Sequence, residues 1–455
     1  MKKLVSLVLA LAMLLSVGLA NATTTINHLS TQFVETNGID AYVQSIAEEK
    51  DISFYSGWYT FDEVREKTIL DHVSGSSEWD LVYVDSPWVP EYAALGALKP
   101  VSELLEMEGT DVETANIDDF IDVHLLRSTY KDTIYTLPHL GAYGTLAYRA
   151  DLFENEEEKA AFLAEYGYEL APPKTYREFY DMSVFFTRKA GEKLAGKVLE
   201  HDFYGTCHSS ANGSFLWNDY VLYLAAFGAD IIVNPETYEV TWNSPESIAA
   251  VTFYRDLYLN AQPVDAINMT GGESDALFAN GFCAMEIEFL NRMVSYVNDP
   301  SVSKVTGLVK YALPPIVEGV EGRDHAFLCN SNGTGVYANS KDPVAAFNVL
   351  AAALSTEGQK WMALNCLGYI PTRQSVYDDP EVLAAMPEVV DYINLVNAND
   401  VYAFAHPQFT EYAEVKEIAG TCVSKILAGA DIESTMNETQ EEIVKIMTKA
   451  GYYNK

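Results

Sequence analysis

The first hundred residues alternate between short runs of strand formers and longer amphipathic stretches. Residues 24–30 and 51–57 are predicted strands that flank a predicted helix at residues 39–49. A second predicted helix spans residues 60–75, ends at a glycine and leads into the apolar run Leu81–Val84. A short apolar run bounded by turn residues is typical of a strand buried on both faces. Strands that alternate with helices in this way indicate the parallel sheets of an α/β fold.

Helix start signals continue this pattern further along the chain. Thr175 is followed three residues later by Glu178, which is the spacing of a capping box at the first turn of a helix. Ser244 before Pro245 predicts a second helix start. Residues 275–291 are predicted to form a helix, a glycine turn and a strand, and the last third of the chain is mostly helical. The sequence contains no internal repeat and no low-complexity linker.

The amino terminus has the pattern of a secretory signal peptide. Lys2 and Lys3 precede the apolar stretch Leu4–Leu19, and Ala20-Asn21-Ala22 fits a cleavage site made of small residues. Residues 1–22 are therefore predicted to be a signal peptide, and the mature chain is expected outside the cytoplasm, periplasmic or extracellular. A membrane anchor is the alternative, but the run is short for a bilayer span. No cysteine follows this stretch, so the lipobox of acylated lipoproteins is missing.

Length and charge narrow the class of function. Removing residues 1–22 from the 455 leaves 433, a length that suggests two domains. The net charge is -36, and it becomes -38 when the two lysines of the signal peptide are removed. Such a surface repels nucleic acid and anionic membranes, so neither is an expected partner. The five cysteines form no C-x-x-C pair and no zinc pattern, and the sequence does not decide whether one disulfide forms.

Several stretches carry a family resemblance, in order, over nearly the whole mature chain. They include "EWDLVYVDSPWVPEYAALGALKP", "LPHLGAYGTLAYRADLFE", "FANGFCAMEIEF", "YALPPIVEG" and "GQKWMALNCLGYIPTRQSVY". Together they resemble the family 1 extracellular solute-binding proteins of carbohydrate ABC importers, the family of the maltose-binding proteins. The chain departs from the family in two places: the lipobox that many members carry is absent, and Asn291 lies near the position where the family usually has a tryptophan.

The resemblance implies a two-lobed α/β periplasmic-binding-protein fold, type II-like, in which each lobe is a mostly parallel sheet flanked by helices. The implied crossings between the lobes lie near Leu137, Pro314 and Pro371. The implied amino-terminal lobe is residues 23–136 with 318–371, and the carboxy-terminal lobe is residues 137–317 with 372–455. The resemblance also implies a carbohydrate or polyol ligand in the cleft, a membrane permease as partner, a monomer, and neither a cofactor nor a metal.

The carboxyl ends of strands supply the first candidate ligand-binding residues, because ligands of open α/β sheets bind there. Asp85, Ser86 and Trp88 directly follow the predicted buried strand. A carboxylate accepts hydrogen bonds from vicinal hydroxyls, and an indole offers a flat apolar face to a sugar ring. Asp85 as the N-cap of the next helix is the alternative, and the two roles are compatible. Trp58 and Tyr59 follow another predicted strand, either as a stacking pair or as packing on the lobe surface.

The crossings and the later loops supply the remaining candidates. His139 and Tyr143 flank Gly141 at the first crossing, where a side chain would touch both lobes. Trp217 and Asn218 precede a predicted helix, and an indole beside an amide is a common grouping at sugar sites, although Asn218 is also a candidate cap. The other candidate ligand-binding residues are Glu288, Asn291, Asn332, Arg373 and Tyr412.

A secreted glycoside hydrolase is the alternative function. Glu286 and Glu288 are two residues apart on a predicted strand and share one face, and glycosidases use paired carboxylates. A solvated strand edge explains the pair equally well, and a chain with 65 acidic residues contains such pairs by coincidence. The G-x-S-x-G, H-E-x-x-H and Walker motifs are absent. The sequence therefore favours a binding protein without catalytic residues.

Overall fold

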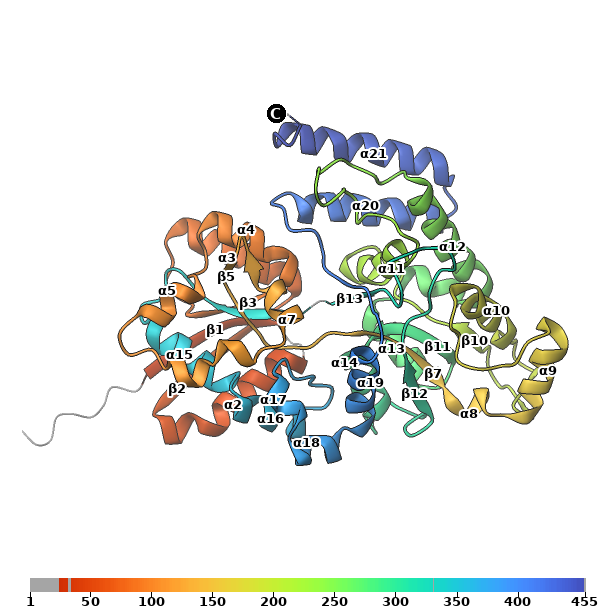
Figure 1. The fold of residues 1–455 in the computed structure, drawn as a ribbon, viewed down its shortest axis with the longest axis horizontal. Coiled ribbons are helices and arrows are strands. Elements are labelled where there is room, and N and C mark those ends of the chain that lie inside the picture. The colour runs from red at the N-terminus through yellow and green to blue at the C-terminus, as the bar shows by residue number, and fades with distance from the viewer. Residues whose placement is uncertain (1–23, 32–33, 330, 454–455) are drawn as a thin grey trace, which may run out of the picture.

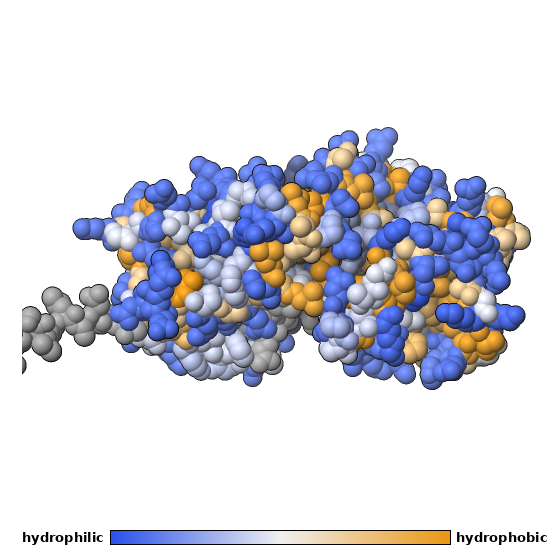
Figure 2. All heavy atoms as spheres, turned by 90° about the horizontal axis from the view of Figure 1, so that it is seen from below, coloured by the Kyte–Doolittle hydropathy of each residue, from blue (hydrophilic) through white to orange (hydrophobic). Residues whose placement is uncertain are grey.

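The computed structural model describes residues 24–31, 34–329 and 331–453, so the predicted signal peptide lies outside the described residues. The chain forms two lobes side by side, each with its own sheet and helices (Figure 1). In the space-filling view the lobes are two rounded masses that meet at a constriction (Figure 2). The two-lobed α/β fold predicted from the sequence is confirmed. None of the described helices combines the length and the apolar character that crossing a bilayer requires.

The first lobe is built on a five-stranded sheet with the order β2-β1-β3-β14-β6. The strands are β1 (Thr24–Thr31), β2 (Ile52–Tyr59), β3 (Leu81–Val84), β6 (Leu137–Pro138) and β14 (Gly333–Val336). β1 pairs in parallel with β2 and β3, whereas β14 runs antiparallel to β3 and to β6. All four residues of β3 are buried, which confirms the prediction of a strand covered on both faces.

The second lobe is built on a four-stranded sheet with the order β10-β11-β7-β12. The strands are β7 (Gly144–Arg149), β10 (Tyr204–Thr206), β11 (Cys283–Phe289) and β12 (Val309–Ala312). Only β10 and β11 pair in parallel, and β7 is antiparallel to both β11 and β12. The expectation of mostly parallel sheets therefore needs correction. Both sheets are mixed, because the strands next to the crossings, β7, β12 and β14, run against their neighbours.

The helices fall into groups along the chain. Before β6 lie α2 (Val34–Lys50), α3 (Phe61–Ser74), the 3₁₀ turn η1 (Ser86–Trp88), α4 (Val89–Leu95), α5 (Val101–Glu106), α6 (Val112–Ala115), η2 (Ile117–Asp119) and α7 (Asp122–Arg127). Between β7 and β12 lie α8 (Ala150–Phe153), α9 (Glu156–Tyr166), α10 (Tyr176–Phe186), α11 (Ser214–Ala226), α12 (Pro245–Ala261), η3 (Val264–Asn268), α13 (Gly271–Ala279) and α14 (Leu290–Asn298). After β14 lie α15 (Pro343–Ala353), α16 (Thr356–Asn365), α17 (Gln374–Tyr377), α18 (Pro380–Ala385), α19 (Pro387–Asn397), α20 (Tyr412–Leu427) and α21 (Ile432–Lys449).

Short strand pairs complete the fold. The hairpins are β4 (Thr129–Tyr130) with β5 (Thr133–Ile134), and β8 (Lys193–Leu194) with β9 (Lys197–Val198). A parallel pair joins β13 (Phe327–Leu328) to β15 (Ala403–Phe404). The two helix starts predicted at Thr175 and Ser244 are confirmed. Glu178 completes the capping box with Thr175, and the Ser244 side chain accepts from Ser247 N at the start of α12.

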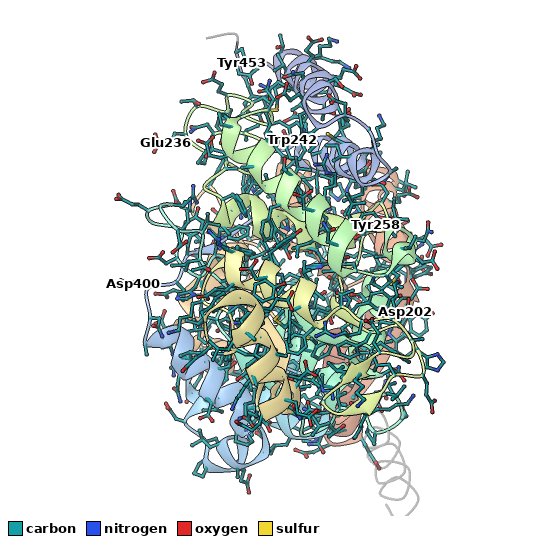
Figure 3. The ribbon with its side chains drawn as sticks, turned by 90° about the vertical axis from the view of Figure 1, so that its right-hand side faces the viewer. Asp202, Glu236, Trp242, Tyr258, Asp400 and Tyr453 are labelled. Atoms are coloured by element: carbon teal, nitrogen blue, oxygen red, sulfur yellow. The ribbon has the colours of Figure 1, made fainter. Side chains whose placement is uncertain are left out.

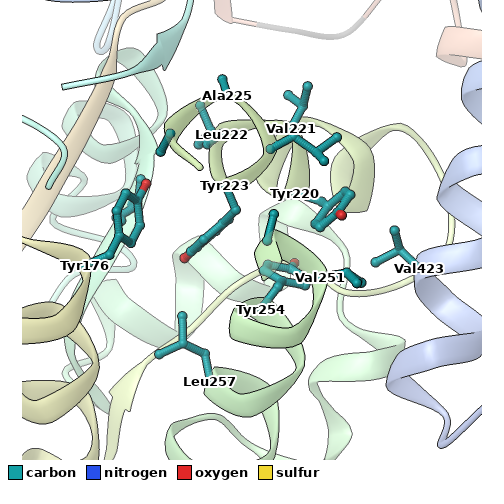
Figure 4. Close-up of a cluster of buried hydrophobic side chains, with 14 of the residues drawn as sticks. Tyr176, Tyr220, Val221, Leu222, Tyr223, Ala225, Val251, Tyr254, Leu257 and Val423 are labelled. Atoms are coloured by element: carbon teal, nitrogen blue, oxygen red, sulfur yellow. The ribbon is translucent and has the colours of Figure 1, made fainter. Parts of the chain in front are cut away.

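Each lobe has its own aromatic and aliphatic core. The larger cluster fills the second lobe, where Tyr176, Tyr223 and Tyr254 come together from α10, α11 and α12 (Figure 4). The Tyr223 ring centroid lies 5.3 Å from that of Tyr176, in a tilted arrangement, and 5.0 Å from that of Tyr254, edge-on, and both are favourable geometries for aromatic pairs. All five cysteines are described, four of them are buried, and none forms a disulfide.

The last third of the chain is divided between the two cores. Val376 and Val389, from α17 and α19, pack in the cluster that contains Ile26 of β1. Val415 and Ile443, from α20 and α21, pack in the cluster of the second lobe. The lobe boundary placed at residue 371 remains a prediction. Helix α19 also contacts β12, and the Tyr392 hydroxyl donates to the carbonyl of Gly144 on β7, so this helix lies against both lobes.

Candidate functional site

Three candidate residues lie next to one another at one edge of the first sheet. The register of the sheet places Gly333 opposite Val84 and opposite Pro138, so Asn332, Asp85 and His139 stand directly beyond the ends of three adjacent strands. The backbone N of His139 donates to the carbonyl of Asn332 over 3.0 Å. Sequence alone did not show this grouping, because β3, β6 and β14 are far apart in the chain.

Asp85 does not cap the helix that follows it. Its backbone is extended, and its carboxylate makes no capping hydrogen bond to η1. The backbone N of Trp88 instead donates to the Asp85 carbonyl over 2.8 Å. The capping alternative is therefore wrong for this side chain.

Helix α20 of the second lobe faces this edge. Tyr412 and Lys416 lie one turn apart on the buried side of α20, and α20 contacts η1. Burial raises the pKa of Tyr412 well above its usual value, and the negative charge of Asp85 adds to the rise. Burial lowers the pKa of Lys416, and the charge of Asp85 opposes that fall. Asp85 and α20 therefore act on each other electrostatically across the junction between the lobes.

A chain of hydrogen bonds fixes Tyr412 in this position. The indole Nε1 of Trp217 donates to the Tyr412 hydroxyl over 3.0 Å, and that hydroxyl lies 2.7 Å from His406 Nδ1. An indole only donates, so the hydroxyl donates onward and His406 Nδ1 accepts. This direction agrees with the pKa of His406, which burial lowers well below its usual value and so keeps the ring neutral. Trp217 and Asn218 lie within α11 rather than before it, which corrects the sequence prediction.

The first crossing contains a second polar network. The Tyr143 hydroxyl lies 3.0 Å from His124 Nε2, and the other nitrogen of His124 contacts the hydroxyl of Ser331. Burial lowers the pKa of His124 to about 3, with the positive charge of Arg127 adding to the effect. Tyr143 is thus held at the junction by a neutral imidazole.

Gly141 allows two crossing segments to pass closely. A Cβ atom at this position would lie 2.9 Å from the carbonyl oxygen of Pro371 and 3.0 Å from the side chain of Ile370. The Gly141 N–H also donates to the Ile370 carbonyl over 2.9 Å. A side chain at Gly141 would push these segments apart, so the glycine is required by close approach and not by backbone conformation.

Glu286 and Glu288 lie inside the second lobe and not at a solvated strand edge. They are 1% and 2% exposed on β11, which is a central strand of its sheet. Glu288 lies 2.9 Å from the guanidinium of Arg292, which also bonds to Asp275 over 2.5 and 2.9 Å. Glu286 accepts from the Ser274 hydroxyl over 2.5 Å. The pair therefore belongs to a buried acidic network, and the solvated-edge interpretation is wrong.

The acidic network has more carboxyls than cations. Burial raises the pKa of Asp275 to about 7 and raises the pKa of Glu286 and of nearby Asp219 well above the usual value. Oxygens of Asp275, Glu286 and Glu288 lie within 4.8 Å of one another, and carboxylate oxygens suit hard cations. The Arg292 guanidinium already bonds to two of these three carboxyls. Bound protons and this one guanidinium balance the charge, and the arrangement does not fit a resident metal.

The Arg373 side chain is buried and bonds to backbone carbonyls of the first lobe. Its guanidinium donates to the carbonyls of Ala115 and Asn116 over 2.7 Å each, and to the carbonyl of Leu354. It also stacks over the ring of Phe120 at 3.9 Å. Asp119 Oδ2 also lies 3.4 Å from Nη1, so these contacts do not favour a ligand-binding guanidinium, and that role stays a prediction.

The tryptophans near the sheet edge differ in exposure. Trp88 is 2% exposed, and its ring centroid lies 4.5 Å from Phe61 and 6.1 Å from Tyr83. Trp58 is 49% exposed and donates to Asp40 over 2.8 Å. Tyr59 is next to Trp58 on β2 and so points to the opposite face. These two cannot form one stacking pair, and only Trp58 presents an open ring.

The remaining candidates are less clearly part of the junction. Ser86 is buried in η1, and Asn291 is buried in the first turn of α14. Lys416 was missed by the sequence analysis. A signal was present in the sequence: Lys416 lies one turn after Tyr412, on the apolar face of the helix, where a lysine is unusual.

A hollow of about 470 Å³ lies away from this junction, between α10, α12 and the segment 316–318.

The model of one protein family matches most of the chain. That family is described as bacterial extracellular solute-binding protein, and the match covers residues 41–389. A solute-binding protein of an ABC transporter from Agrobacterium radiobacter, in complex with ribitol, has a similar structure. Its TM-score is 0.78 at 23% identity, over 93% of this chain and 98% of that one.

Two further solved structures share the fold. T. maritima MalE3 with bound maltose has a TM-score of 0.75 at 21% identity, over 93% of this chain and 100% of that one. The GacH receptor of Streptomyces glaucescens, solved unliganded and with acarbose, has a TM-score of 0.72 at 19% identity, over 94% and 99% of the two chains. At these identities the likeness shows the two-lobed fold.

Proposed function

The chain belongs to the bacterial extracellular solute-binding proteins, and from this membership we propose that it captures a sugar, oligosaccharide or polyol between its lobes and delivers it to the permease of an ABC importer. The observation that carries the proposal is the sheet edge with Asp85, Asn332 and His139, opposed by Tyr412 and Lys416 of α20. The protein works as an exported monomer, without a cofactor and without nucleic acid.

The chemistry of the junction suits a neutral, polyhydroxylated ligand. Among the described residues, Asn332 Oδ1 and His139 Nε2 are buried polar atoms without a hydrogen-bond partner. Buried polar atoms are nearly always satisfied, so unsatisfied ones at a lobe junction are suited to bonding a ligand hydroxyl. The Asp85 carboxylate accepts hydroxyl donors strongly, and the nearby Lys416 ammonium balances its charge. An ionic ligand would upset that balance.

Binding is coupled to movement of the lobes. The candidate residues come from both lobes, so a ligand gains all its contacts only when the lobes are close together. A ligand that binds one state better than the other shifts the equilibrium toward that state. The closed form then presents a joint surface of both lobes to the permease.

The paired carboxylates do not favour the glycosidase alternative. A glycosidase needs one ionised and one protonated carboxyl facing the scissile bond. Here Glu288 is bonded to Arg292, and Glu286 is bonded to Ser274 inside the second lobe. Membership of a family of solute-binding proteins also supports a protein that binds its ligand without transforming it.

The test is a thermal-shift screen of the secreted chain against neutral sugars, oligosaccharides and polyols. A ligand at 100 times its Kd is expected to stabilise the fold by about 2.7 kcal/mol. Asp85→Asn should weaken that ligand tenfold or more, whereas Asp118→Asn, an exposed acid on η2, should leave affinity unchanged. Recovery of a chemically altered ligand, or no shift with any member of the panel, would contradict the proposal.

A further inference from the structure

The hollow between α10, α12 and the segment 316–318 lies on the second lobe, away from the lobe junction. Its volume of about 470 Å³ is within the range of small-molecule sites. Helix α12 runs across the outer side of this lobe, from near Trp242 to Tyr258 (Figure 3). Arg177 and Glu318 of the lining are exposed, so the hollow is accessible from solvent. It is called the α10–α12 pocket below.

Four aromatic residues form the apolar wall of this pocket. The ring centroid of Phe253 lies 5.6 Å from that of Tyr176 and 5.9 Å from that of Tyr180. Phe227 lies 5.3 Å from Phe253 and 5.9 Å from Tyr176. Tyr176 stands at the margin of the second-lobe core, beside Tyr223 (Figure 4). The other three rings of the wall are only half-buried, so they keep apolar surface for a ligand.

The segment 316–318 is fixed to the start of α10 and closes one side of the pocket. The backbone N of Tyr176 donates to the Ile316 carbonyl over 2.9 Å, and the backbone N of Ile316 donates to the Lys174 carbonyl over 2.9 Å. Val317 packs against the core of the second lobe. The pocket is therefore preformed, and a ligand does not pay to order its walls.

A buried hydroxyl in the lining lacks a partner. Tyr176 is 2% exposed, and among the described residues its hydroxyl has no hydrogen-bond partner. Burial raises the pKa of Tyr176, so the hydroxyl stays protonated at neutral pH and its oxygen can accept a hydrogen bond. Buried polar atoms are nearly always satisfied, so an unsatisfied hydroxyl in the wall of a hollow points to a ligand with a polar group.

The charged groups of the lining determine which polar group fits. Asp256 and Glu318 contribute carboxylates, and Arg177 contributes the guanidinium among these lining residues. Asp256 Oδ1 also lies 3.5 Å from Nη2 of Arg255, but both side chains are partly exposed, and such a pair contributes little. Burial raises the pKa of Tyr180, and the negative charge of Asp256 adds to the rise, so the field of this acid reaches the aromatic wall. The excess of negative charge favours a cation over an anion.

We propose that the α10–α12 pocket is a second ligand site of this protein, for a small organic amine in its ammonium form with an apolar body. The aromatic wall takes up the apolar body, and an ammonium over the face of such a ring is attracted by it. The Tyr176 hydroxyl oxygen accepts one ammonium N–H, and the carboxylates of Asp256 and Glu318 balance the charge. Because the aromatic wall packs on the core of one lobe, binding there does not depend on closure of the lobes.

The probes share one aromatic ring and differ in charge. They are 2-phenylethylamine as the cation, 2-phenylethanol as the neutral probe, 3-phenylpropionate as the anion and phenylalanine as the zwitterion. Binding is measured by calorimetry on the full secreted chain at neutral pH and low salt. We expect the amine to bind about tenfold tighter than the propionate and about threefold tighter than the alcohol, and to weaken as salt is added.

Variants of the lining test the assignment of each group. Asp256→Asn and Glu318→Gln should each weaken the amine about threefold and leave the alcohol unchanged. Tyr176→Phe should also weaken the amine and keep the fold, because the hydroxyl has no partner to lose. Tyr220→Phe removes another buried hydroxyl without a partner, and Asp265→Asn removes an exposed acid of η3 outside the pocket. Both controls should leave amine affinity unchanged.

The other outcomes overturn the proposal. Equal affinity for the amine and the alcohol, unaffected by the acid variants, would show an apolar surface without selectivity for a cation. Tighter binding of phenylalanine than of the amine, lost in Arg177→Gln, would show a zwitterion site instead. Loss of amine binding in Asp85→Asn would place the amine at the lobe junction. No binding of any probe would show that the pocket is not a site for this class of ligand.

Discussion

Trp217 donates its indole N–H to the hydroxyl of Tyr412 over 3.0 Å, although 195 residues separate them in sequence. The bond joins α11 to α20 and fixes the position of the Tyr412 hydroxyl. Two residues that the sequence analysis named separately as ligand contacts are thus partners of each other. Their first role is structural, and any contact of Tyr412 with a ligand depends on that support.

Tyr412→Phe is expected to destabilise the fold by about 1 to 3 kcal/mol, because it leaves the buried indole N–H of Trp217 without an acceptor and removes the donor to His406. Urea unfolding measures the change. The control is Tyr220→Phe on α11, whose buried hydroxyl has no hydrogen-bond partner and should be removed at little cost. Equal losses for both variants would contradict the hydrogen-bond argument.

Arg373→Lys is expected to cost about 3 kcal/mol or more of folding stability. A lysine cannot reproduce the fork that serves the carbonyls of Ala115, Asn116 and Leu354, and buried carbonyls would lose their donors. Ligand affinity per folded molecule should stay unchanged. Arg323→Lys, at a partly exposed arginine stacked 4.1 Å over Tyr402, is the control with a small expected effect. A selective loss of affinity in the Arg373 variant would favour the ligand-binding interpretation.

Trp88→Ala and Trp58→Ala should have opposite consequences. Trp88 fills a buried aromatic cluster, so its truncation is expected to cost about 3 to 5 kcal/mol in stability. Trp58 is half exposed at the end of β2, so its truncation should cost under about 1 kcal/mol and act mainly on ligand affinity. Denaturant unfolding and calorimetry on the same samples separate the two quantities. A destabilised Trp58 variant with unchanged affinity would show that Trp58 only packs.

Local signals in the sequence predicted the elements well. The helix 61–74 ends at Gly75 with a φ of +73°, and the capping box of Thr175 and Glu178 forms as its spacing indicated. These features depend on neighbours within a few residues. The predicted helix–glycine–strand unit became α13, Gly281 and β11 for the same reason.

Partners distant in sequence explain what the sequence could not show. The donors of Arg373 end on carbonyls 257 and 258 residues away, and nothing near Arg373 distinguishes them from ligand oxygens. The position of Asn332 beside Asp85 depends on the register of two antiparallel strands from different parts of the chain. The roles of the candidate residues in binding a ligand stay predictions.

The acidic network of the second lobe gives the fold a distinctive response to pH. Burial raises the pKa of Asp275 from its ordinary 3.8 to about 7, and raises that of Glu286 well above 4.5. Between about pH 4 and pH 7 the folded chain therefore holds protons that the unfolded chain releases. Since stability rises with pH only where the unfolded state binds more protons, these carboxyls make stability fall as pH rises through this window.

Glu286→Gln tests this relationship, because the amide cannot titrate yet still accepts a hydrogen bond from Ser274. At pH 4.5 the wild-type carboxyl is protonated, so the two proteins should be equally stable. At pH 7.5 the variant should be the more stable by about 1 kcal/mol or more, since one pKa unit corresponds to about 1.4 kcal/mol. Urea unfolding at several pH values measures the difference, and the exposed Asp118→Asn variant should follow the wild-type curve. A difference between Glu286→Gln and wild type that is the same at every pH would show that folding does not raise the pKa of Glu286.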